Sequence, residues 1–220
     1  MTAFDQALQR RRSQNLAAPR TDARAVTPSI RSFSQAIDRQ RARVERVPLL
    51  RAVRPDLATV AQALDRAEVT ALAIAVEDPQ VELGAFAAAA NVVTVPVLRA
   101  DLLLEEFQIY QSRAAGADAV LLYARLLPGA LLAQLCSAAR STHMSACVAC
   151  QSSDEVVRAV AARADVLALE DVGLAPRRAL VLALAAGDWK GRADAVLDAS
   201  LGDARDPARE FSLALAAPEE

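Results

Sequence analysis

From Val47 onward, short apolar runs alternate with longer segments in which apolar residues recur every three to four positions. The short runs predict strands buried on both faces, and the longer segments predict amphipathic helices. The predicted strands are residues 47–51, 71–76, 93–98, 118–122, 145–150, 165–169 and 194–197. The predicted helices include residues 57–67, 82–90, 105–115, 129–140 and 153–162. This alternation is typical of an α/β protein, either a (β/α) barrel or an open doubly wound sheet.

The chain ahead of the first strand has a different pattern. Residues 4–14 predict a short amphipathic helix, and the prolines and polar residues of 15–30 predict a linker. Ser32 is a candidate N-cap for a helix with the sequence FSQAIDRQRARVER. Further along, Gly116 is expected to end the helix that precedes the strand ADAVLL. We therefore expect a basic N-terminal helix and linker over 1–30 and one barrel or sheet domain over 31–220.

The length of 220 residues suits one domain, or a barrel near the lower size limit. No apolar run reaches the roughly eighteen residues of a membrane span. The first residues, MTAFDQALQRRRSQ, lack the apolar stretch of a signal peptide. The sequence thus predicts a cytoplasmic protein with no membrane association.

The chain has three cysteines, an odd number that favours reduced thiols over a disulfide framework. Cys147 and Cys150 form a C-x-x-C pair, which could serve as a redox or zinc site. Zinc would need about two further ligands, and His143 is the only histidine. The pair also falls in a predicted strand, where residues three apart point to opposite faces. We expect buried structural cysteines, no metal and no cofactor.

Charge divides the chain unevenly. Residues 1–54 hold twelve arginines and four acidic residues, whereas residues 55–220 hold thirteen basic and twenty-three acidic residues. A basic arm can bind nucleic acid, here through Arg10, Arg11 and Arg12, or an acidic protein surface. Because the arm lacks interleaved aromatic residues for stacking on bases, docking onto the chain's own body or onto a protein partner is favoured over nucleic acid.

The segment from Pro96 to Leu122 reads PVLRADLLLEEFQIYQSRAAGADAVLL. It resembles the part of indole-3-glycerol phosphate synthases in which a strand ends P-V-L-R-K-D-F and a helix follows with Q-I-Y-x-x-R-A-A-G-A-D-A-V-L-L. The family's R-S-F-x-x-A-L helix is also matched, by Arg31, Ser32, Phe33, Ala36 and Ile37. This resemblance implies descent from an enzyme of tryptophan biosynthesis and decides for a (β/α) TIM-type barrel.

Near the end of the chain, DAVLDASLGDARDPAREFSLAL resembles the family's eighth strand and closing helix. Between the sixth predicted strand and this one, the chain has about half as many residues as the family uses. The resemblance therefore implies a barrel truncated by about one βα unit near strands six to eight. Residues 177–187, RRALVLALAAG, are either helix six or a short strand seven. A missing unit would leave either a strained seven-stranded closure or two strand edges with unpaired backbone groups, which predicts a homo-oligomer or a protein partner.

The resemblance also assigns catalytic positions. The family's general acid, the lysine of R-K-D, is Ala100 here, and the only lysine of the chain is Lys190. The glutamate and lysine of the family's first strand, E-I-K, correspond to Leu49 and Arg51. The general base, a glutamate in the fifth strand, corresponds to Ala149. No catalytic residue of the family is thus retained at these positions.

The positions that would bind phosphate have changed as well. The family's sixth-strand motif N-N-R-D-L becomes Glu170, Asp171, Val172, Gly173 and Leu174, so that a phosphate-binding arginine is replaced by valine. The glycine of the eighth-strand V-G-E motif corresponds to Asp198. The resemblance implies an acidic remnant pocket that repels phosphate, formed by Arg51, Arg99, Asp101, Glu170, Asp171 and Asp198.

Together these features predict a catalytically inactive pseudoenzyme that acts as a protein-binding or assembly module and has no small-molecule substrate. The alternative is an active or repurposed lyase of the indole-3-glycerol phosphate synthase type. In the repurposed case, carboxylates and an arginine could bind a small cationic substrate or a metal; the residues in question are Asp101, Glu170, Asp171 and Arg51.

Overall fold

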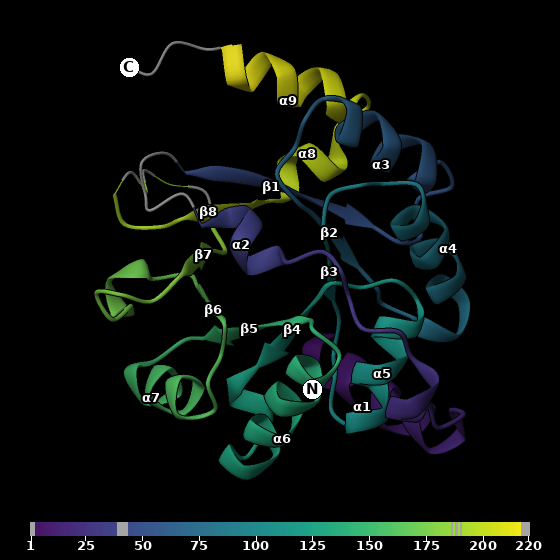
Figure 1. The fold of residues 1–220 in the computed structure, drawn as a ribbon, viewed down its shortest axis with the longest axis vertical. Coiled ribbons are helices and arrows are strands. Elements are labelled where there is room, and N and C mark those ends of the chain that lie inside the picture. Colours follow the sequence, from purple (N-terminus) through teal and green to yellow (C-terminus); the bar gives the residue numbers. More distant parts are fainter. Residues whose placement is uncertain (1–2, 39–43, 186, 188, 190, 217–220) are drawn as a thin grey trace.

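The computed structural model describes residues 3–38, 44–185, 187, 189 and 191–216. Eight parallel strands follow one another in chain order and close into a barrel, with helices on its outside (Figure 1). The strands are β1 (Glu45–Arg51), β2 (Leu72–Ala75), β3 (Val97–Ala100), β4 (Ala119–Tyr123), β5 (Ser145–Cys150), β6 (Val166–Leu169), β7 (Val181–Ala183) and β8 (Ala195–Asp198). The predicted (β/α) barrel is confirmed.

The helices agree closely with the pattern of apolar positions. The α-helices are α1 (Ala3–Ala17), α2 (Phe33–Ile37), α3 (Leu57–Arg66), α4 (Pro79–Asn91), α5 (Glu106–Ala114), α6 (Gly129–Ser141), α7 (Ser153–Ala161), α8 (Ala199–Asp203) and α9 (Pro207–Ala216). Short 3-10 turns are η1 (Ala23–Ala25), η2 (Ala124–Leu126) and η3 (Val172–Leu174). Gly116 follows α5 with a φ of 96°, a conformation that favours glycine, and so ends the helix as predicted.

The third strand begins later than its apolar run indicates. Residues 93–96 of the predicted strand form a loop, and β3 starts at Val97. The backbone N–H groups of Thr94 and Val95 donate to the carboxylate of Asp65, each at 3.1 Å, instead of to a neighbouring strand. A side chain at the end of α3 therefore satisfies backbone groups that the sequence pattern assigned to the sheet.

The short segment between β6 and β8 lacks α-helices among its described residues but keeps its strand. Within residues 177–187, Val181–Ala183 forms strand β7, which decides between the two alternatives for this segment. β7 pairs with β6 and β8, so the predicted strand edges are wrong. The described residues between β6 and β8 contain η3 and no α-helix. Lys190 lies outside the described residues.

Two apolar layers hold the barrel together. The interior is filled by small and branched side chains, including Ala73, Leu98 and Ala168, and a second layer packs the outer strand faces against the helices. Phe33 and Ile37 of α2 are fully buried with the interior layer. The hydroxyl of Ser32 accepts a hydrogen bond from the backbone of α2, which confirms the predicted N-cap. Residues 39–43 of the predicted helix lie outside the described residues.

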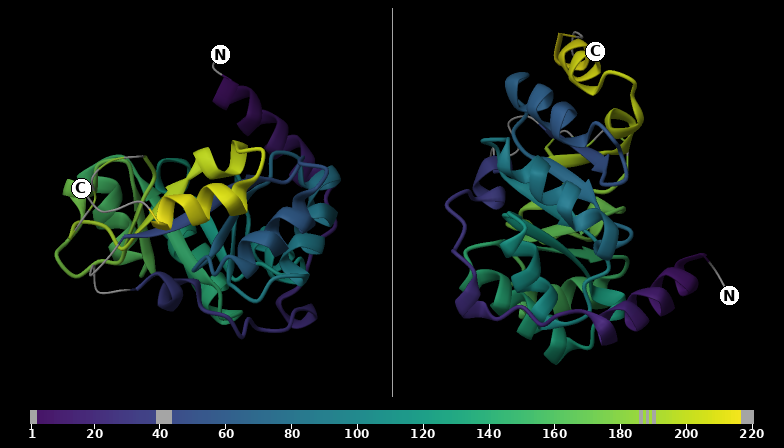
Figure 2. Two further views of the ribbon diagram at one scale, coloured as in Figure 1. Left: turned by 90° about the horizontal axis from the view of Figure 1, so that it is seen from above. Right: turned by 90° about the vertical axis from the view of Figure 1, so that its right-hand side faces the viewer.

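The N-terminal segment runs along the outside of the barrel from α1 to α2 (Figure 2). The face that α1 buries is polar: the Asn15 amide exchanges hydrogen bonds with Gln108, at 3.2 and 3.0 Å, whereas Leu16 is 86% exposed. The predicted helix over 4–14 is present within α1, but the side chains that α1 buries, Arg11 and Asn15, are polar instead of forming an apolar stripe. The docking itself agrees with the predicted attachment of the basic arm to the chain's own body.

In the described part of the chain, no helix combines the length and the apolar character needed to cross a membrane.

Candidate ligand site at the barrel mouth

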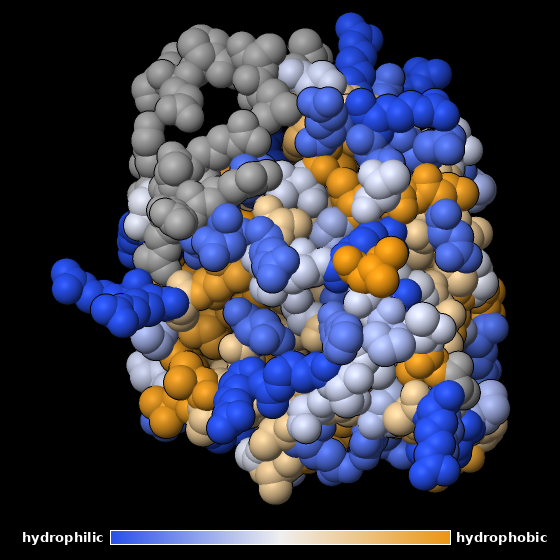
Figure 3. All heavy atoms as spheres, viewed as in Figure 1, coloured by the Kyte–Doolittle hydropathy of each residue, from blue (hydrophilic) through white to orange (hydrophobic). Residues whose placement is uncertain are grey.

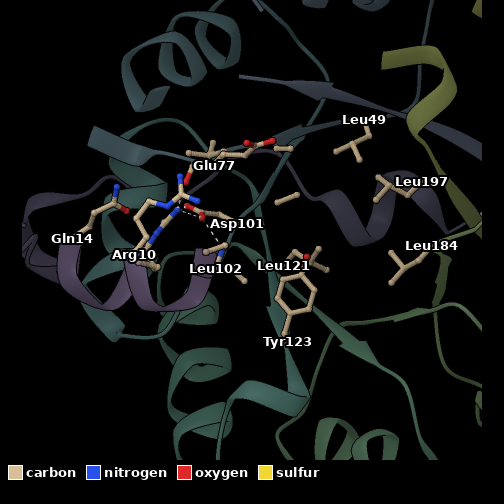
Figure 4. A pocket seen from close by; sticks show the side chains of 15 residues that line it. Arg10, Gln14, Leu49, Glu77, Asp101, Leu102, Leu121, Tyr123, Leu184 and Leu197 are labelled. Atoms are coloured by element: carbon tan, nitrogen blue, oxygen red, sulfur yellow. Dashed lines mark hydrogen bonds and ion pairs between the residues drawn. The ribbon is translucent and has the colours of Figure 1, made fainter. Parts of the chain in front are cut away.

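A cavity of about 330 Å³ lies at the C-terminal ends of the strands, beneath α1 (Figure 4). This is the end of a (β/α) barrel at which ligands bind. Its lining residues come from α1 and from strands on both sides of the barrel; they are Ala7, Arg10, Arg11, Gln14, Leu49, Ala75, Val76, Glu77, Ala100, Asp101, Leu102, Leu121, Tyr123, Leu184 and Leu197. Ten of the fifteen are alanine, valine, leucine or tyrosine, which makes the cavity predominantly apolar.

Two of the assigned catalytic positions meet in this cavity. Leu49 and Ala100 both line it; the resemblance assigns these positions to the first-strand glutamate and the acid. Ala149, at the position of the base, is 6% exposed within the barrel interior and is not among the lining residues. Neither leucine nor alanine has a group that titrates, so these positions can bind an apolar ligand but cannot transfer a proton.

At the polar side of the cavity lies a buried cluster of two arginines and one carboxylate, which we call the Arg–Asp–Arg cluster (Arg11, Asp101 and Arg99). Arg11 and Asp101 line the cavity, and Arg99 lies behind them. Arg11 binds both Asp101 oxygens, at 2.8 and 2.7 Å, and Arg99 binds one of them, at 2.6 Å. The three side chains are at most 2% exposed. Burial lowers the pKa of Arg99, and the Asp101 carboxylate counteracts this effect. The backbone N–H of Leu102 also donates to Asp101, at 2.6 Å.

Two of the residues expected around the pocket, Arg51 and Asp198, do not line the cavity and form ion pairs. Arg51 pairs with Glu77, and both side chains are more than half exposed. Asp198 pairs with Arg46 and accepts hydrogen bonds from Ser200, at 2.6 Å, and from a backbone N–H of α8. Burial opposes the ionisation of Asp198, but the bonds from Ser200 and Arg46 outweigh it and lower its pKa. Its carboxylate thus caps α8 by accepting from the backbone N–H of Leu201.

The sixth-strand residues do not form part of the cavity either. Glu170 and Asp171 are exposed, and the Asp171 carboxylate accepts a hydrogen bond from the backbone of Gly173, at 2.8 Å. Val172 is 4% exposed in the outer apolar layer. Of the six residues expected around the pocket, only Asp101 lines it. The structure thus places an apolar cavity where the sequence predicted an acidic one.

The cysteines lie apart from this cavity. Cys136, Cys147 and Cys150 are all free thiols and buried. Burial raises the pKa of Cys136 to about 11 and that of Cys150 to about 12, so neither is a thiolate near neutral pH. Among the residues that the structure describes, no three His, Cys, Asp or Glu side chains gather as metal ligands would.

Most of the lining residues could not be predicted from the sequence. Leu121 and Leu197 belong to predicted strands, but which face of a strand points inward depends on the register of the barrel. Leu184 falls in residues 177–187, for which the sequence predicts either a helix or a strand. Tyr123 directly follows the fourth predicted strand, at the end where functional residues cluster, and this position was the one available signal.

Comparison with known proteins supplies the family. The model of the family "Indole-3-glycerol phosphate synthase" matches residues 5–175, which is more than half of the chain. The chain belongs to the indole-3-glycerol phosphate synthase family. The family's signature segment, from Pro96 to Leu122, lies within the matched region.

Individual relatives in the indole-3-glycerol phosphate synthase family match over shorter segments. The indole-3-glycerol phosphate synthase of Albidiferax ferrireducens is 40% identical over 80 residues, 36% of this chain and 30% of the relative. That of Verminephrobacter eiseniae is 45% identical over 67 residues, 30% of this chain and 25% of the relative. The matched segments thus span less than a third of these two relatives' length.

A solved structure described as "Native KDPGal structure" aligns with a TM-score of 0.61 at 15% identity, covering 80% of this chain and 94% of that chain. A second, described as a cube-shaped, highly porous designed protein cage, aligns with a TM-score of 0.59 at 16% identity, covering 80% and 72%. At these identities the likeness shows the barrel fold alone.

Proposed function

We propose that this member of the indole-3-glycerol phosphate synthase family is catalytically inactive and acts as a protein-binding or assembly module. The proposed catalytic inactivity is supported by the residues that line the cavity. Leu49 and Ala100 stand where the family has a glutamate and its acid, and the surrounding leucines add no group that could replace either. Each such group contributes a factor of about 10²–10⁴ to a reaction rate.

The same geometry argues against the alternative of a repurposed lyase. That alternative needs carboxylates free to bind a cation. Asp101 is saturated by two arginines and a backbone N–H, and Asp171 accepts a bond from its own loop. Arg51 does not line the cavity and is paired with Glu77, which does. These groups do not converge on a common point in the cavity.

The wild-type protein is expected to show no turnover of the family's substrate, the anthranilate-derived ribulose phosphate. The reason is the absence of both proton-transfer groups, at Ala100 and Ala149. The measurement is the appearance of indole glycerol phosphate by its fluorescence, together with complementation of a tryptophan-requiring strain that lacks its own synthase. Growth of that strain on the wild-type gene would overturn the proposal.

The second part of the proposal rests on an exposed apolar surface. Val157 and Val160 of α7 are 67% and 51% exposed, and hydrophobic residues gather over α7 on the surface (Figure 3). α7 is the last α-helix before the sector between β6 and β8 that contains no further α-helix among the described residues (Figure 1). Exposed apolar groups beside a sector without helical cover are suited to contact with another protein chain.

We expect the wild-type protein to form oligomers at micromolar concentration and the double change Val157→Glu and Val160→Glu to shift it to monomers. Charges on α7 would have to be desolvated in a contact, which weakens association. The measurement is light scattering coupled to size exclusion. The matched control changes Val53 and Val81, which are 65% and 77% exposed, to glutamate and should leave the oligomer intact. A wild-type monomer throughout the concentration series would contradict self-assembly.

A further inference from the structure

The floor of the cavity is built by leucines from distant parts of the chain. Leu49 comes from β1, Leu121 from β4 and Leu197 from β8, while Leu184 follows β7 directly. Figure 4 shows these side chains around the central space, with Tyr123 beside them. Burial raises the pKa of the Tyr123 hydroxyl, which remains a neutral hydrogen-bonding group. A ligand seated on this floor gains from burying apolar surface and would lose by placing a charge there.

The charges at the α1 side of the cavity are unbalanced. In the Arg–Asp–Arg cluster, two guanidinium groups share one carboxylate, so the buried cluster carries a net positive charge. Asp101 accepts from Arg11, Arg99 and Leu102, and has no carboxylate oxygen left for a ligand cation. The Nε of Arg11 is buried with no hydrogen-bond partner among the described residues.

Arg10 adds a second positive charge at the same side. It lines the cavity and is exposed, and no hydrogen bond or ion pair joins it to another described residue. The neighbouring acidic group, Glu77, is already paired with Arg51. The cavity therefore presents an apolar floor on one side and an available guanidinium on the other.

We propose that the cavity binds a small amphipathic carboxylate, with its aliphatic chain on the leucine floor and its carboxylate at Arg10. The volume of about 330 Å³ lies at the lower end of the range of small-molecule sites, which fits a short chain better than a large ring system. A phosphate ester is disfavoured because most of the lining is apolar and the transfer of a doubly charged group into it costs more than that of a single carboxylate. This inference rests on the proposed function, since it describes a ligand that is bound and not converted.

The test measures calorimetric binding of octanoate, octanol and inorganic phosphate to the full chain. Octanoate should bind, octanol should bind at least about tenfold more weakly because it lacks the charge, and phosphate should not bind. Arg10→Gln should weaken octanoate binding about tenfold and leave octanol binding unchanged. Arg12→Gln is the matched control, because Arg12 lies on the same helix, is exposed and does not line the cavity. Leu184→Asn should weaken both probes.

Three outcomes would overturn the inference: no binding of octanoate at millimolar concentration, equal binding of octanoate and octanol, or equal losses in the Arg10 and Arg12 variants. Thermal unfolding of each variant establishes that it is folded before binding is compared. The result is independent of the activity assay. Turnover of the family's substrate would overturn the proposed inactivity alone, whereas failure of octanoate to bind would overturn the ligand class alone.

Discussion

A protein carrying both Ala100→Lys and Ala149→Glu is expected to remain without measurable turnover of the family's ribulose phosphate substrate. The two changes return the acid and the base, but the rest of the site is still missing. Leu49 leaves the first-strand glutamate absent, and the Asp198 carboxylate, held by Arg46, occupies the end of α8 near the expected phosphate position. The electrostatic stabilisation of the transition state, typically the largest single contribution to catalysis, would not be restored.

The measurement is a single-turnover assay at high enzyme concentration, which detects rates far below those of a working enzyme. Ala149 is 6% exposed inside the barrel, so a glutamate at this position would be buried among apolar residues. The free energy of unfolding of the double variant must therefore be measured together with its activity. Ala100→Lys alone is the folded control, because Ala100 is partly exposed to the cavity. Turnover by the double variant would mean that the pocket retains far more of the family's machinery than its lining indicates.

Most of the fold follows from local patterns, because the signals act over a few residues. Ser32 caps α2, Gly116 ends α5, and the apolar periodicity predicts α3 to α7 to within a few residues. The exceptions arise where a side chain from a distant part of the sequence binds backbone groups that would otherwise pair with a strand. The carboxylate of Asp65 binds the backbone of Thr94 and Val95 and delays the start of β3, which no apolar pattern can reveal.

The number of strands was underestimated for a different reason. β7 is only three residues long, and its flanking residues lack a helical neighbour whose pattern would mark its boundaries. Counting residues between recognisable strands predicted a missing unit, whereas the chain keeps the strand and shortens the connections. Closing the hydrogen-bonded ring of a barrel requires every strand, but a helix on the outside can be replaced by loop residues packed on the same surface.

The candidate site was only partly predictable. The resemblance assigned Leu49 and Ala100 to one site by alignment with strand ends, and both residues line the cavity. It placed Asp198 and Glu170 around the same pocket. In the structure, Asp198 forms an ion pair with Arg46, and Glu170 is exposed to solvent. The sequence indicated Arg11 only as part of a basic arm that could bind nucleic acid, and its pairing with Asp101 could not be predicted, since the two residues are ninety positions apart.

Asp101→Asn is expected to lower the free energy of unfolding by about 3–5 kcal/mol, because it removes the only carboxylate among two buried guanidinium groups. Arg11 and Arg99 are 2% and 0% exposed, so water cannot replace the lost charge. The amide can still accept a hydrogen bond, but it cannot neutralise either arginine. The docking of α1 depends on the same contact and should loosen with it.

Urea unfolding at neutral pH measures this loss, and the matched control is Glu77→Gln. That change breaks the ion pair with Arg51, whose partners are more than half exposed, and should cost less than about 1 kcal/mol. The double change Asp101→Asn and Arg11→Met should be less destabilising than Asp101→Asn alone, since it removes one of the two uncompensated charges. Equal losses in the Asp101 and Glu77 variants would mean that the Arg–Asp–Arg cluster is solvated, and the net positive charge assigned to the cavity would then be screened by water.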